Sequence, residues 1–189
     1  MKRLLAFILT LAAVLSSVQL DGAATGVQEK VLRLHVLAAS DSENDQQLKL
    51  AARDAVLEFI TPLLEACGSR EEAVLLAEEN LPMLARLAAD ASGQRATAYI
   101  SRGDFPCREY GGFSLPAGEY TALRIELENG SGQNWWCVVF PPLCTALAEE
   151  DEDTFALFDE DETRLISGSG KIVKFRITQW LSALKKALI

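Results

Sequence analysis

The sequence predicts an α+β fold with a mostly antiparallel four-stranded sheet, in the order strand-helix-helix-strand-strand-strand, and helices on one face of that sheet. Three observations predict it. An apolar run lies at residues 31–40, two helical stretches repeat apolar residues every three or four positions, and three later segments have the pattern of strands. Glycine-rich and polar links join those later segments, which favours an antiparallel meander. Segregation of helices and strands in this way is typical of an α+β layer.

The first strand and the first helix are predicted from "VLRLHVLAAS" and the residues that follow it. The apolar run ends on Ser40 and indicates a buried strand. Ser40 and Glu43 have the Ser-x-x-Glu spacing in which a hydroxyl and a carboxylate satisfy free amides at a helix N-terminus. Apolar residues then recur at helical spacing from Leu48 to Leu63, so one side of the helix is expected to face a core. The helix is expected to end before Gly68.

The second helical stretch has the same capping spacing and then a break. Ser69 and Glu72 repeat the Ser-x-x-Glu pattern. Proline has no amide proton and clashes with the preceding turn, so a break at Leu81 and a new helix from Pro82 are expected. Gly93 is expected to end that helix.

Three segments are predicted to be strands: "RATAYIS" (95–101), "EYTALRIELEN" (119–129) and "NWWCVVF" (134–140). Strand alternation gives the middle segment one apolar face and one that faces water. That alternation places Leu123, Ile125 and Leu127 on one face and Arg124, Glu126 and Glu128 on the other.

The N-terminus is predicted to be an export segment. Lys2 and Arg3 precede an apolar run without charges from Leu4 to Val18, the pattern of a secretory signal. We predict that residues 1–24 are a signal peptide, cleaved after Ala24, or an N-terminal membrane anchor. The protein is therefore expected to be exported.

The 189 residues are enough for one core of ordinary size after such a leader. We predict a single α+β domain over residues 30–147 and an extended acidic linker over 148–170, because blocks of like charge repel one another. Residues 171–189 are basic with an apolar stripe, and they predict an amphipathic C-terminal helix. This helix either packs on its own domain or contacts a partner or a membrane surface.

Charge and cysteine content limit the partners. A net charge of -9 makes nucleic acid an unexpected partner. No metal or other cofactor is expected, because the four cysteines have no metal-like spacing and the chain has one histidine. In an exported protein two disulfides are favoured. Of the three possible pairings, the preferred one is Cys137 with Cys144 and Cys67 with Cys107.

The residue types that enzymes use are sparse. The chain has no GxSxG, GxxxxGK[ST] or HExxH motif. His35 lies in an apolar strand, where a histidine is more often a packed residue than a catalyst. Carboxylates are abundant, but most lie on predicted helix surfaces or in the tail. We therefore expect a protein that is not an enzyme.

The stretch "NWWCVVFPPLC", residues 134–144, has two readings. Alternation sends Trp135 and Trp136 to opposite faces of a strand, and Pro141 and Pro142 end that strand. One reading is a stapled structural corner, closed by a bridge from Cys137 to Cys144. The other is an aromatic patch for a protein partner, because tryptophan is enriched at binding hot spots.

Four ordered motifs resemble the stage II sporulation protein R family of endospore-forming bacteria. They are "VLRLHVLAASDSENDQQLKLAARDAV", "FPCREYGGFSLPAGEYTALRIEL", "GQNWWCVVFPPLC" and, more loosely, "KIVKFRITQWLSAL". The resemblance implies a forespore protein exported into the space between forespore and mother cell. There it would activate a membrane-embedded aspartic protease, which cleaves the pro-sequence of a sigma factor. The family pattern carries Cys137 and Cys144, whereas Cys67 and Cys107 are additions in this chain.

The resemblance supplies no catalytic residues, so the candidate contact surface rests on motif position and chemistry. The alternatives are a secreted hydrolase acting on the cell wall, with Cys137 or Cys144 as nucleophile beside His35 and with Glu119 in its cleft, and a membrane-tethered structural protein. The candidate contact residues for the protease are Pro116, Ala117, Gly118, Glu119, Tyr120, Asn134, Trp135, Trp136, Pro141 and Pro142.

Overall fold

The computed structural model describes residues 21–110, 113–143 and 155–167. They form two compact units. The larger unit comprises Glu29–Asp104 and Glu119–Leu157, and the smaller unit comprises residues up to Gln28, Phe105–Gly118 and residues from Phe158. The elements in chain order are a helix over 21–30, β1 (Leu32–Leu37), α2 (Glu43–Glu65), α3 (Arg70–Glu79), α4 (Leu81–Ser92), β2 (Ala96–Phe105), β3 (Arg108–Tyr110), β4 (Phe113–Leu115), β5 (Gly118–Leu127), β6 (Asn134–Phe140) and α5 (Glu160–Ser167).

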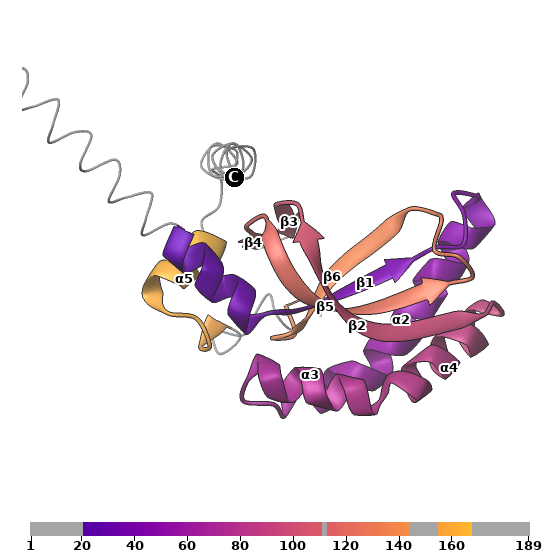
Figure 1. Ribbon diagram of the computed structural model, residues 1–189, viewed down its shortest axis with the longest axis horizontal. Helices are drawn as coiled ribbons and strands as arrows, with labels where there is room; N and C mark the ends of the chain where they lie inside the picture. The colour runs from indigo at the N-terminus through magenta and orange to yellow at the C-terminus, as the bar shows by residue number, and fades with distance from the viewer. Residues whose placement is uncertain (1–20, 111–112, 144–154, 168–189) are drawn as a thin grey trace, which may run out of the picture. The chain divides into compact units, whose positions relative to one another are not determined.

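The larger unit is a four-stranded sheet with α2, α3 and α4 on one face (Figure 1). Its strand order is β2-β5-β1-β6, with β1 parallel to β5 and antiparallel to β6. The α+β class and the placement of the helices are confirmed. The antiparallel meander is wrong, because β1 lies between β5 and β6 and makes the sheet mixed.

The position of β1 has a physical reason. Five of its six residues are buried, from Leu32 to Val36, on both faces of the sheet. A strand buried on both faces belongs in the interior of a sheet, where it has a hydrogen-bonded neighbour on each side. The continuous run "LRLHVL" is the sequence signature of such an interior strand. The short links between the later strands were therefore weaker evidence for sheet order than the composition of the first one.

The helices follow the predicted signals closely, with one change of cap. Ser42 caps α2, accepting a hydrogen bond from the Asp45 amide at 3.1 Å. The predicted Ser40–Glu43 cap is wrong, because the Ser40 hydroxyl donates to the Asp45 carboxylate at 2.5 Å instead. Ser69 caps α3 as predicted. α4 begins one residue before Pro82 and ends at Gly93, which is left-handed with φ 66°.

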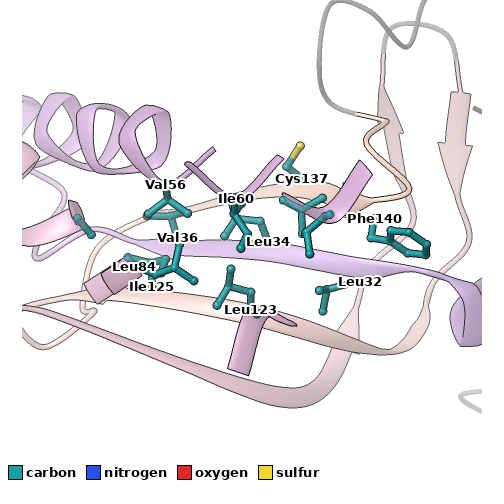
Figure 2. Packing of buried hydrophobic residues seen from close by; sticks show 14 of the residues in the cluster. Leu32, Leu34, Val36, Val56, Ile60, Leu84, Leu123, Ile125, Cys137 and Phe140 are labelled. Carbon is teal, nitrogen blue, oxygen red and sulfur yellow. The ribbon is translucent and has the colours of Figure 1, made fainter. Parts of the chain in front are cut away.

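The core of the larger unit lies between the sheet and the helices (Figure 2). Alternate residues of β1 and β5 meet an apolar stripe on α2 and the inner side of α4. Each of these side chains is fully buried, and burial of each contributes about 1.5–3 kcal/mol. The residues at the centre are Leu32, Leu34, Val36, Val56, Ile60, Leu84, Leu123 and Ile125.

The smaller unit contains a hairpin and a short helix that the sequence analysis did not predict. β3 and β4 pair antiparallel, with Tyr110 stacked on Phe113 at 4.7 Å between ring centroids. α5 packs against β4. The expectation of an extended chain throughout 148–170 is wrong, because α5 occupies part of it. Asp159 and Glu162 each accept a hydrogen bond from the other's backbone amide, at 2.8 and 2.7 Å, and so start the helix.

Several predictions concern residues outside the described ranges. These are residues 1–20 of the leader, residues 148–154 and 168–170 of the acidic linker, Cys144 and the basic helix over 171–189. Within residues 21–110, 113–143 and 155–167, no helix has both the length and the hydropathy that crossing a bilayer requires.

Candidate functional site: the polar face of the sheet

The two tryptophans of β6 lie on opposite faces of the sheet, as strand alternation predicts. Trp135 is half-buried and packs against the core on the helix side. There the guanidinium of Arg53, on α2, lies 4.7 Å from the centroid of its ring. Trp136 is also half-buried, and its ring meets His35 edge to face at 5.7 Å between centroids. Trp136 therefore belongs to the face opposite α2, α3 and α4.

We call this face the polar sheet face and define it by His35, Tyr99, Arg124, Glu126 and Trp136. Strand register aligns three of them across the sheet, since His35 pairs with Arg124 on β5 and with Trp136 on β6. The Tyr99 hydroxyl, on β2, donates to Glu126 at 3.0 Å. Four strands thus contribute polar or aromatic side chains to one surface. Of the predicted contact residues, Asn134 is exposed and shares the alternation of Trp136.

The environment of His35 favours the neutral form of its imidazole. Burial is the main cause that lowers the pKa of His35 below its usual 6.5, and the positive charges of Arg124 and Arg33 lower it further. A hydrogen bond with Asn134 and the charge of Glu126 act in the opposite direction. A neutral imidazole can pack against the ring of Trp136 and can also take part in binding a partner.

The lowered pKa predicts how stability depends on pH. The unfolded chain binds a proton at His35 near pH 6.5, whereas the folded chain binds it only at lower pH, so the free energy of unfolding falls as pH drops below about 6.5. Urea unfolding between pH 7.5 and 5 measures this slope. His35→Gln is expected to make the slope shallower, and an unchanged slope would contradict the assignment.

The arrangement does not bring Cys137 and His35 together as the hydrolase alternative requires, while its other candidate nucleophile, Cys144, lies outside the described residues. Cys137 pairs with Leu34 in the β1–β6 register and belongs to the core on the helix side. His35 lies on the opposite face, beside Trp136. A histidine cannot take a proton from a sulfur on the other side of the sheet. In the residues that the structure describes, no three His, Cys, Asp or Glu side chains form a metal-binding group either.

The predicted turn residues 116–120 differ widely in exposure. Tyr120 is fully buried, with the guanidinium of the buried Arg33 5.0 Å from its ring centroid. Glu119 is exposed and pairs with Arg102 at 3.1 Å. Pro116 is buried, and Ala117 and Gly118 are half-buried. At the end of β6, Pro141 is buried and Pro142 half-buried. Tyr120 and the two buried prolines therefore offer little area to a partner.

The cysteines divide into two groups. No disulfide joins Cys67 to Cys107 in the structure, so the predicted bond between them is not formed. They lie in different units of the chain. Burial, followed by the charge of Glu72, raises the pKa of the Cys67 thiol and makes it a poor nucleophile. Cys137 is not a free thiol, but its expected partner Cys144 lies outside the described residues, so their pairing stays a prediction.

A polar junction that the sequence analysis missed fixes the start of β6. The Gly132 amide donates to the carbonyl of Ala38 at 2.9 Å, and the next amide, that of Gln133, donates to Asp41 at 2.8 Å. The buried Lys49 donates to the carbonyl of Gln133 at 3.1 Å. The loop is thereby tied to the end of β1 and to α2, which sets the position of the tryptophans. Arg33, Asp41 and Arg53 do not form one cluster here, since each has a different partner.

Comparison with known proteins matches the same part of the chain. The family model described as stage II sporulation protein R matches residues 28–150. The stage II sporulation protein R of Bacillus subtilis (strain 168) is 35% identical over 185 residues, which covers 84% of this chain and 83% of that protein. No solved structure matches. With a family model that spans the whole sheet and a relative this similar over most of its length, the chain belongs to the stage II sporulation protein R family.

Proposed function

We propose that the protein is an exported sporulation signal that activates a membrane-embedded aspartic protease. The protease then cleaves a pro-sigma factor in the mother cell. Membership of the stage II sporulation protein R family carries this proposal. The signal acts in the space between forespore and mother cell, after export through the segment at residues 1–24.

The protein acts by binding and performs no catalysis of its own. The separation of Cys137 and His35 by the sheet supports this, because it leaves that nucleophile without its base. A face with a half-buried tryptophan, an arginine and a histidine also has the composition of a recognition surface. A bridge between Cys137 and Cys144 would hold the end of β6 in place and is part of the proposal.

Reconstitution in a host that does not sporulate tests the function. The full chain is produced together with the candidate protease and its pro-sigma substrate, and substrate shortening is followed by immunoblot. We expect shortening that requires both the protein and its residues 1–24. A full-length substrate in cells that contain folded, exported protein and a competent protease would contradict the proposal.

The size of the exported protein separates a released signal from a tethered one. A released signal has lost residues 1–24 and is found in the soluble fraction. A chain that keeps them and sediments with membranes acts as a tethered activator instead. Shortening of the substrate in either case leaves the activating role intact.

A further inference from the structure

The polar sheet face contains an arginine without a partner. Among the described residues, no carboxylate or other acceptor bonds the guanidinium of Arg124, and its Nε atom is buried. Two exposed arginines of the same unit contrast with it, since Arg95, just before β2, pairs with Glu128, and Arg102, in β2, pairs with Glu119. A buried donor without an acceptor costs about 1–3 kcal/mol. Arg124 as a whole is only half-buried, so an acceptor on another molecule can reach the rest of its guanidinium without displacing an ion pair.

The surroundings of Arg124 favour an anion. His35 faces it across the β1–β5 pair, and Arg33 lies two residues before His35 on the same face of β1. The Ser101 hydroxyl on β2 is also buried without a hydrogen-bond partner. These groups gather in a chain whose net charge is -9. The positive charge on this side of the sheet comes from Arg124 and the buried Arg33, because His35 favours its neutral form, and it does not follow from the composition.

The space beside the guanidinium depends on a glycine. A Cβ atom built on Gly103, in β2, would lie 3.2 Å from Nη2 of Arg124. A side chain at position 103 would require the guanidinium to move by a few tenths of an ångström. Gly103 thus gives the arginine room to lie along the sheet.

We infer that Arg124 is the centre of a binding site for a carboxylate carried by an extended segment of a protein partner, with Trp136 as its apolar wall. The planar guanidinium matches a carboxylate with two parallel hydrogen bonds. Glu126 is the next residue of β5 on the same face, two positions after Arg124. Its charge would repel a doubly charged phosphate more than a singly charged carboxylate. The identification of this partner as the protease rests on the proposed function, whereas the chemistry of the site does not.

The single histidine of the chain provides a direct readout of binding. Synthetic peptides that cover the extracytoplasmic segments of the candidate protease are added to the folded protein, and the His35 imidazole signal is followed by NMR. A matched set has every Asp and Glu replaced by Asn and Gln and an amidated C-terminus. We expect an acidic peptide to raise the pKa of His35 and its neutral match to leave it unchanged. Equal shifts from both sets, or none from either, would overturn the inference.

Processing in the reconstituted system provides the second arm. Arg124→Gln is expected to lower the rate of substrate shortening about tenfold or more, since a charge-assisted pair is lost. Arg124→Lys should keep part of the activity. The control is Arg102→Gln, which removes an exposed arginine of the same sheet that already has a partner. If Arg124→Gln does not fold, the NMR comparison on the unmodified protein still decides the inference.

The outcomes of the two arms separate the two proposals. Wild-type processing by folded Arg124→Gln would overturn the carboxylate site and leave the signalling function standing. If the unmodified chain triggers no processing, the signalling function fails, and the NMR comparison alone decides whether the face binds a carboxylate.

Discussion

Replacing Trp136 with alanine is expected to abolish signalling while the domain stays folded. Trp136 is half-buried on the polar sheet face, opposite the helix-side core, and its ring meets His35 edge to face. Its removal therefore leaves the helix-side core intact. Truncation of a tryptophan at the centre of an interface costs about 2 kcal/mol or more, which corresponds to roughly thirtyfold weaker binding. Substrate shortening in the reconstituted system and urea unfolding of the purified domain measure the two effects.

Trp135→Ala is the matched control, because it removes the same side chain from the other face of the same strand. Trp135 packs against the core and beneath Arg53. We expect a loss of about 1–3 kcal/mol in the free energy of unfolding, less than for a fully buried aromatic residue. Signalling should persist where the variant is folded. Wild-type signalling by both variants, or loss in Trp135→Ala alone, would contradict the assignment of the contact to the polar sheet face.

Replacing Gly132 with alanine is expected to destabilise the fold severely. The added Cβ would lie 2.2 Å from the carbonyl oxygen of Ser40, a backbone atom that cannot rotate away. Relief of this clash requires the loop to move, which breaks the hydrogen bonds from Gly132 to Ala38 and from Gln133 to Asp41. Overpacking and the lost hydrogen bonds together predict about 3 kcal/mol or more.

Gly93→Ala separates this steric effect from the general cost of replacing a glycine. Gly93 has φ 66° and no atom within 4 Å of a built Cβ. The substitution therefore costs only the strain of a left-handed alanine, about 1 kcal/mol. Urea unfolding of both variants gives the comparison. A Gly132→Ala variant as stable as Gly93→Ala would show that the loop before β6 is not tied to β1 as described.

The local elements were predictable because their signals are local. The cap at Ser69, the break near Pro82 and the end at Gly93 each depend on one or two side chains and the backbone beside them. β6 has the bounds that "NWWCVVF" predicts. The opposite orientation of the two tryptophans follows from strand geometry alone.

Sheet order was not predictable from the links between strands, because it depends on contacts between distant segments. β1 enters between β5 and β6 since its side chains are buried on both faces, and this burial is decided by the whole unit. α5 was missed because a block of acids masked the Asp159-x-x-Glu162 spacing that caps it. In that case a local capping signal outweighed the repulsion between like charges.

In the candidate site, too, single residues were predictable and their contacts with distant segments were not. The sequence indicated Trp136 as a contact residue, but it gave no reason to join it to His35 and Arg124, which are far from it in the chain and meet it only through strand register. Tyr120 and Pro116 were predicted to contact the partner on motif position, yet both are buried. Aromatic and proline residues serve cores as well as interfaces, and only the three-dimensional structure separates these roles.

Site-specific photo-crosslinking tests the central claim most directly. A photoreactive amino acid replaces Asn134, which is exposed beside Trp136, or Leu75, which is 61% exposed on α3. Both variants are produced with the candidate protease and its substrate, and irradiated while processing is under way. The account predicts an adduct with the protease from position 134 and none from position 75. An adduct from position 75 alone, or none from position 134 while the substrate is shortened, would contradict activation through the polar sheet face.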